Sequence, residues 1–155
     1  MKQILTFENG GVQFEDISAF NKSFVDLYKA TNTSLPVDTF VKAPFTSSDV
    51  KADLNSEYDS VNNKVIVKQA GVYVISLHCG FRYDNNYNEK DSEVRCYKNG
   101  ACLFYAYSSS TSSNPCTNIT KSCLLSANDE IEMYLKADQY AGGTWLYNMT
   151  IARVS

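Results

Sequence analysis

The sequence predicts an all-β protein, built as a two-sheet sandwich or jelly roll. Three observations favour this class. From about residue 39 onward, apolar and polar residues alternate with a period of two, as they do on a strand with one buried face. Turn signals rich in glycine and asparagine separate these segments at short intervals. Eleven tyrosines and eight phenylalanines, against seven glycines and three prolines, fit pleated, half-buried surfaces.

The first clear strands lie in the middle of the chain. Lys64–Lys68 alternates, with Val65 and Val67 on one face. Gly71 then turns the chain into a strand at Val72–His78, which is apolar on nearly both faces. A segment that is apolar on both faces is typical of a central strand with cover on each side. We therefore place Val72–His78 at the centre of a sheet.

The next predicted strands form a hairpin. Glu93–Tyr97 alternates so that Val94 and Cys96 face inward, while Glu93, Arg95 and Tyr97 face outward. Lys98–Gly100 supplies the turn, because asparagine and glycine tolerate the positive φ angles of a tight hairpin. The returning strand covers 101–107.

The remaining strands follow a polar stretch at 108–114, which we expect to be a mobile loop. Ile119–Leu125 is the next strand, and Glu130–Lys136 shows the clearest alternation in the chain. The expected inward side chains of that strand are Ile131, Met133 and Leu135, and one face of the last strand is expected to carry Trp145, Tyr147, Met149 and Ile151.

The first 38 residues have a different pattern. Asn9-Gly10 between two short apolar runs predicts a β-hairpin. A helix is expected next, because Ile17, Phe20, Phe24, Leu27 and Tyr28 fall on one helical stripe after a capping Asp16 or Ser18. We therefore expect two units, an N-terminal hairpin-helix attachment element at 1–38 and the sandwich domain at 39–155.

Four motifs of the second unit, in order, resemble the C1q/tumour-necrosis-factor superfamily. They are Tyr58-Asp59 through Lys64–Val67, then Ala70–Ser76 (AGVYVIS), then Val94–Gly100 (VRCYKNG), then Leu124–Ile131 (LLSANDEI). The resemblance covers about residues 40–155. It implies a ten-stranded jelly roll, a three-fold trimer and a role in binding rather than catalysis. Similar modules occur in secreted animal proteins, in bacterial spore-surface proteins and as bacteriophage fibre heads.

Composition and charge limit the partners and the cellular compartment that we expect for this protein. Fourteen basic and seventeen acidic residues leave a formal charge of −3 and no basic block, so nucleic-acid binding is not expected. The sequence contains no run of about 18 apolar residues, so we expect no insertion into a membrane. The start of the chain lacks the apolar run of a secretory signal, which predicts assembly in a cytoplasm. We expect a virion protein that joins other virion or surface proteins through residues 1–38, with a secreted ligand or lectin as the alternative.

The cysteines also favour assembly in a cytoplasm. Their number is odd, and no Cys-x-x-Cys pair occurs among Cys79, Cys96, Cys102, Cys116 and Cys123. Most lie in apolar, strand-like segments, where a reduced cysteine behaves as a small hydrophobe. We therefore expect free thiols and no disulfide.

Catalysis and cofactors are not expected. The single histidine, His78, is insufficient for a cupin-type metal site and has no nucleophile motif beside it, so we interpret it as a core or interface residue. Glu130 and Glu132 are interpreted as the solvated face of a strand rather than a hydrolytic pair. The acidic and asparagine-rich run at 84–91 could offer oxygens to calcium, but a plain polar loop is the preferred interpretation.

Two surfaces are predicted. A binding surface for host glycan or protein is expected where tyrosines mix with short polar groups, and its residues are Tyr83, Asp84, Tyr87, Asp91, Tyr105 and Tyr107. The alternative is that these tyrosines pack within or between subunits. A trimer interface is expected from one face of the central strand, at Tyr73, Ile75 and Leu77, together with the outward Tyr97 of the neighbouring hairpin.

Overall fold

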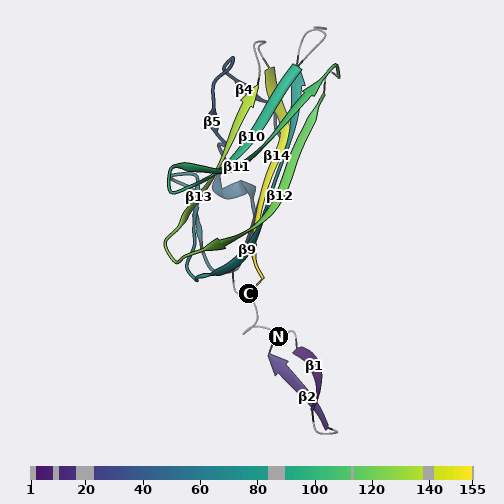
Figure 1. The fold of residues 1–155 in the computed structure, drawn as a ribbon, viewed down its shortest axis with the longest axis vertical. Helices are drawn as coiled ribbons and strands as arrows, with labels where there is room; N and C mark the ends of the chain where they lie inside the picture. Colours follow the sequence, from purple (N-terminus) through teal and green to yellow (C-terminus); the bar gives the residue numbers. More distant parts are fainter. Residues whose placement is uncertain are drawn as a thin grey trace.

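The computed structural model describes residues 3–8, 11–16, 23–83, 90–112, 114–137 and 142–154. Two antiparallel sheets of six strands pack face to face, and a separate two-stranded hairpin precedes them (Figure 1). Among the described residues, no helix is long and apolar enough to cross a membrane.

The sheet that we call sheet 1 is centred on the longest strand. Its order is β12 (Cys116–Leu125), β9 (Gly71–Tyr83), β14 (Gly142–Arg153), β3 (Phe24–Lys29) and β6 (Val50–Asp53), with β4 (Thr33–Leu35) paired to β14. Because β9 has a partner along each edge, the strand that the sequence placed at the centre of a sheet does lie there.

The facing sheet, which we call sheet 2, carries the predicted hairpin. Its order is β11 (Ala101–Ser110), β10 (Lys90–Lys98), β13 (Glu130–Ala137), β8 (Lys64–Ile66) and β7 (Tyr58–Asp59), with β5 (Val41–Lys42) paired to β13. Asn99 and Gly100, the expected turn residues between β10 and β11, have φ angles of 51° and 79°. Strand β11 extends to Ser110, so the predicted loop at 108–114 begins later than expected.

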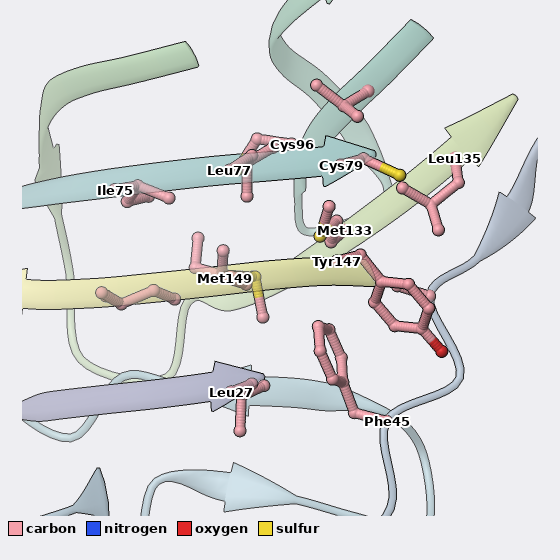
Figure 2. Close-up of a cluster of buried hydrophobic side chains, with 14 of the residues drawn as sticks. Leu27, Phe45, Ile75, Leu77, Cys79, Cys96, Met133, Leu135, Tyr147 and Met149 are labelled. Carbon is pink, nitrogen blue, oxygen red and sulfur yellow. The ribbon is translucent and has the colours of Figure 1, made fainter. Parts of the chain in front are cut away.

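The core lies between the two sheets. Alternate residues of β9 point into it, and they meet the inward residues of β14 and β13 (Figure 2). Tyr147 closes the core beside Phe45, with ring centroids 4.9 Å apart. Complete burial of a large apolar side chain stabilises the fold by roughly 1.5–3 kcal/mol, relative to leaving that side chain exposed. The expected inward residues Val65, Val67, Val94, Cys96, Ile131, Met133 and Leu135 are all at most 1% exposed.

The prediction of a helix is wrong for the part of the segment that the structure describes, which begins at Ser23. Phe24–Lys29 is strand β3, in which Val25 and Leu27 are buried and alternate with more exposed neighbours. The edge of β14 offers this segment a ladder of backbone hydrogen bonds, and that tertiary pairing overrides the helical spacing of the stripe. The start of the predicted helix, at 17–22, lies outside the described residues.

The domain boundary expected at residue 38 is corrected for the same reason. Both β3 and β4 come from the first 38 residues, yet both pair with β14 in sheet 1. Ser23 also belongs to the sandwich, because its hydroxyl donates to the buried carboxylate of Glu57 over 2.5 Å. The predicted hairpin does form, as β1 (Gln3–Glu8) paired with β2 (Gly11–Asp16). The sandwich therefore begins by Ser23, and the hairpin precedes it.

Candidate functional sites on the two outer faces

The predicted trimer-interface residues do not form one surface. Tyr73, Ile75 and Leu77 are all 0% exposed, because they are the inward residues of β9 and fill the core of a single chain. Tyr97 lies on sheet 2, on the far side of that core, where its ring is 4.6 Å from that of Tyr134. The expectation is therefore wrong for the three β9 residues. The outward face of β9 carries the even-numbered residues instead, and it is mixed, with Val74 followed by Ser76 and His78.

The outer face of sheet 1 consists of rows that cross β12, β9, β14 and β3. The register places Asn118, His78, Asn148 and Tyr28 in one row. The next rows are Thr120, Ser76, Thr150 and Asp26, and then Ser122, Val74, Ala152 and Phe24. In these rows only Asp26 and His78 are of acidic or basic types. The face is therefore built mainly from small, uncharged side chains.

Polar groups on this face are bonded to one another. Asn148 donates to Asp26 Oδ1 over 2.8 Å, and Thr150 donates to the same oxygen over 3.0 Å. The hydroxyls of Ser76 and Thr120 are 2.9 Å apart across β9 and β12. Satisfied polar groups cost little when a second surface covers them, whereas unpaired ones are expensive to bury.

Trp145 also lies on the outer face of sheet 1, contrary to expectation. The register of β14 against β9 shifts between Thr144 and Leu146, so that Trp145 is an extra residue in a bulge. Its indole covers Gly80, and a Cβ there would overlap the ring. Tyr147, Met149 and Ile151 do face inward as predicted. Trp145 is 40% exposed, and Leu124 at the other end of this face is 73% exposed.

The outer face of sheet 2 has the opposite character. Tyr105 and Tyr107 of β11 lie opposite Arg95 and Glu93 of β10. The Arg95 guanidinium lies 3.9 Å above the Phe40 ring centre and 5.7 Å from that of Tyr105. Its Nε donates to the Glu93 carboxylate over 2.6 Å, and this bond raises the pKa of Arg95. Aromatic rings and charged groups therefore alternate on this face.

A shallow hollow opens on the same face. Its volume is about 70 Å³, and it is lined by Asp91, Ser92, Glu93, Tyr107 and Lys136. The ammonium of Lys136 lies 5.3 Å from the Phe40 ring centre and pairs with Asp38 over 2.6 Å. Asp91 and Tyr107, two of the predicted binding residues, thus meet at one hollow, with Tyr105 two residues further along the strand.

Tyr83, another predicted binding residue, is not part of this surface. Tyr83 is only 3% exposed, and its hydroxyl donates to the backbone carbonyl of Asp91, so its role is structural. Asp84 and Tyr87 lie outside the described residues, as does most of the candidate calcium run. Among the residues that the structure does describe, no group of three or more His, Cys, Asp or Glu side chains is placed to hold a metal ion.

Sequence reasoning missed Phe40, Lys136 and Asp38 as members of this site. Phe40 and Asp38 precede β5, and they lie beside Lys136 because β5 pairs with β13 and Val37 bridges Ala137. Local alternation carries no signal for such a long-range contact.

Glu130 and Glu132 are partnered, because Lys64 bonds Glu130 over 2.5 Å and Lys42 bonds Glu132.

All five cysteines are free thiols. Cys79 and Cys96 are buried in the core, and burial raises the pKa of both thiols. Cys102 and Cys116 are exposed, the first on β11 and the second opposite Gly80 at the end of β12. The exposure of Cys102 differs from the strand interior that the sequence predicted.

Known structures define the class of fold. The globular domain of zebrafish complement 1qA protein superposes with a TM-score of 0.62 over 86% of this chain and 97% of its own, at 14% identity. Murine APRIL at pH 5.0 gives 0.55 over 83% and 97%, at 15% identity. The sequence matches no family model and no curated protein. The chain therefore has the C1q/tumour-necrosis-factor-like jelly-roll fold that its four motifs predicted.

Proposed function

We propose that this chain is a non-catalytic, homotrimeric display module that associates through the outer face of sheet 1. The observation that carries the proposal is the character of that face. Its rows hold small, uncharged residues around Ser76, and Leu124 and Trp145 add exposed apolar area at its ends. The centres of protein interfaces are depleted of charge in the same way. Closed three-fold packing would cover such a face without open-ended assembly.

The setting that we propose is a bacteriophage fibre or head-decoration protein, assembled in the host cytoplasm and carried on the virion. The free thiols of Cys79 and Cys96, buried in the core, support folding under reducing conditions. A secreted ligand or lectin, the alternative setting, would fold in an oxidising compartment. The proposed activity is the display of a binding surface to host glycan or protein.

The attachment element in this proposal is residues 1–22 rather than 1–38. The hairpin β1–β2 forms a sheet of its own, whereas β3 and β4 belong to the sandwich. A module that keeps its jelly roll intact can offer such a hairpin to another virion protein, whose exposed strand edge would extend it.

Light scattering on the purified full chain tests the trimer. The native protein is expected to have the mass of three chains. Ser76→Arg and Thr120→Arg, both on the outer face of sheet 1, are expected to give monomers, because each would place three cations in a desolvated interface. Thr120 is exposed on an outer strand, so its change leaves the core untouched. Ser60→Arg in an exposed turn is the matched control and is expected to remain trimeric.

A native chain that is monomeric at micromolar concentration would contradict the trimer. The same conclusion would follow if Thr120→Arg and Ser76→Arg were both folded and both kept the native mass. Circular dichroism of each variant identifies a loss of mass that is caused by unfolding.

A further inference from the structure

Two tyrosine rings stand out on the outer face of sheet 2. Tyr105 and Tyr107 are 59% and 56% exposed, more than any other aromatic side chain that the structure describes. They are two residues apart on β11, so they point to the same side about 7 Å apart along the strand. These two neighbouring exposed rings, which we call the platform, add aromatic area to one side of β11, and contiguous exposed apolar area marks interaction sites more often than single scattered residues do.

The cations beside this platform are already neutralised. Arg95 is bonded to Glu93 and stacked on Phe40, and Lys136 is paired with Asp38. Each cation is therefore held in one orientation by a carboxylate and a ring. A ligand that is recognised by its own negative charge would have to break these pairs. The face thus offers preorganised polar groups but no uncompensated positive charge for a phosphate, sulfate or carboxylate.

The hollow beside Tyr107 is lined with hydrogen-bonding groups. The carboxylates of Asp91 and Glu93 are acceptors and the Lys136 ammonium donates, whereas the Ser92 hydroxyl is buried and bonded to that of Thr117. With a volume of about 70 Å³, it lies well below the range of roughly 300–1,000 Å³ that is usual for small-molecule sites. It is therefore too small to enclose a ligand, and it suits the hydroxyl-bearing edge of one small ring, with a neighbouring ring able to lie on Tyr105.

A protein partner fits this face poorly. Interface centres are depleted of lysine, glutamate and aspartate. Here Asp91, Glu93 and Lys136 surround the hollow itself. Covering them with a second protein would desolvate two carboxylates and an ammonium together, which is costly unless each is matched. A small ligand that brings hydroxyl groups to these side chains avoids that cost.

We propose that the outer face of sheet 2 binds a neutral pyranose glycan, with sugar rings stacked on Tyr105 and Tyr107 and hydroxyl groups bonded to Asp91 and Glu93. The C–H groups on one face of a pyranose carry small positive charge and pack on the electron-rich face of a tyrosine ring. This inference rests on the proposed display function and specifies its ligand. A trimer would present three such sites and gain avidity on a glycan-coated surface.

The test measures binding of the full chain to immobilised neutral trisaccharides of glucose, galactose and mannose, with sialylated and sulfated glycans alongside. We expect binding to at least one neutral trisaccharide that high salt does not weaken, because salt screens only charge-based attraction. The double variant Tyr105→Ala/Tyr107→Ala is expected to bind at least about tenfold more weakly, since each site loses two stacking contacts. Asp91→Asn should also weaken binding.

Matched variants separate the site from general effects. Tyr105→Phe/Tyr107→Phe retains both rings and is expected to stay within about threefold of the native chain, because stacking needs the ring rather than the hydroxyl. Leu54→Ala removes an exposed apolar side chain from a turn elsewhere and should bind normally. Light scattering on every variant reports the oligomer separately, so a failure of glycan binding is distinguishable from a failure of the trimer.

Three results would overturn the inference. One is no binding to any neutral trisaccharide by a chain with its native oligomeric mass. The second is salt-sensitive binding to sialylated or sulfated glycans only, which would assign the face to anions. The third is loss of binding in Leu54→Ala to the same extent as in the double alanine variant.

Discussion

The two outer faces of the sandwich have the same architecture but different chemistry. Each is the outward half of an alternating sheet over one shared core. On sheet 1, the row through Ser76 has only Asp26 as a charged residue, and that carboxylate is bonded within the face. On sheet 2, Arg95 and Lys136 stand among aromatic rings, and each is paired with a carboxylate.

Under the two proposals, the difference assigns two kinds of recognition to the two faces of one fold. Inward positions must satisfy the same packing requirement on both sheets, so they are mostly apolar, and two exceptions, Ser92 and Thr117, are bonded to each other. Outward positions are free of that requirement, so their composition reflects what covers them. A charge-poor face fits a second protein surface, and a face with preorganised charges and exposed rings fits a hydroxyl-rich ligand.

Deleting strands from sheet 1 should have the largest effect. Removal of residues 2–38 takes away β3 and β4, which exposes one edge of β14 and removes the buried Val25 and Leu27. Losing two buried aliphatic side chains alone costs about 4 kcal/mol or more, a large part of the stability of a domain. We expect the shortened chain to be unfolded or insoluble, as judged by circular dichroism.

The matched deletion is residues 2–22, which spares Ser23 and every sandwich strand. This chain is expected to keep its Tm within a few degrees and its trimeric mass, while losing incorporation into particles. A folded chain after the longer deletion would show that sheet 1 does not need β3. A shorter deletion that unfolds would place the hairpin within the folding unit.

A smaller effect is expected from Gly80→Ala on the outer face of sheet 1. The added methyl group would overlap the Trp145 indole, which must then move away from β9. Overpacking of this kind typically costs about 1–3 kcal/mol. Because Trp145 is the single tryptophan of the chain, its fluorescence reports the displacement directly. We expect a red-shifted emission maximum and a lower Tm. An unchanged spectrum would mean that the indole does not cover Gly80.

Several elements could be predicted from the sequence because their signals are local. Alternation identified the inward residues of β10 and β13, and Asn99-Gly100 marked the hairpin turn. The fold class followed from four such motifs in order. Of the residues predicted for the binding surface, Asp91 and Tyr107 line one hollow, and Tyr105 lies two residues from Tyr107 on the same strand.

The errors arose where distant pairing decides the outcome. The stripe containing Phe24 and Leu27 has helical spacing, but the edge of β14 makes it a strand. A one-residue bulge moved Trp145 to the other face of its sheet. For β9, the sequence is apolar on nearly both faces, and the face of Tyr73, Ile75 and Leu77 is the one that is buried in the core. A period of two cannot indicate which of two apolar faces is buried.

The smallest effect, and the most direct comparison of the two faces, concerns the exposed thiols. Cys102 lies opposite Tyr97 on sheet 2, and Cys116 lies opposite Gly80 on sheet 1. Both are exposed in the isolated chain, so both should react with a thiol reagent in the Thr120→Arg monomer. In the proposed trimer, Cys116 is expected to react roughly tenfold more slowly while Cys102 is unchanged, because only covered groups are protected.

Peptide mapping after brief labelling distinguishes the two sites without a change in stability. Cys79 and Cys96 provide the internal reference, since burial raises the pKa of both thiols and they should react only after unfolding. If Cys102 were the protected thiol, sheet 2 would be the face that meets neighbouring copies, and the roles proposed for the two faces would be exchanged. Equal labelling of Cys102 and Cys116 in a chain of trimeric mass would place the contacts away from both.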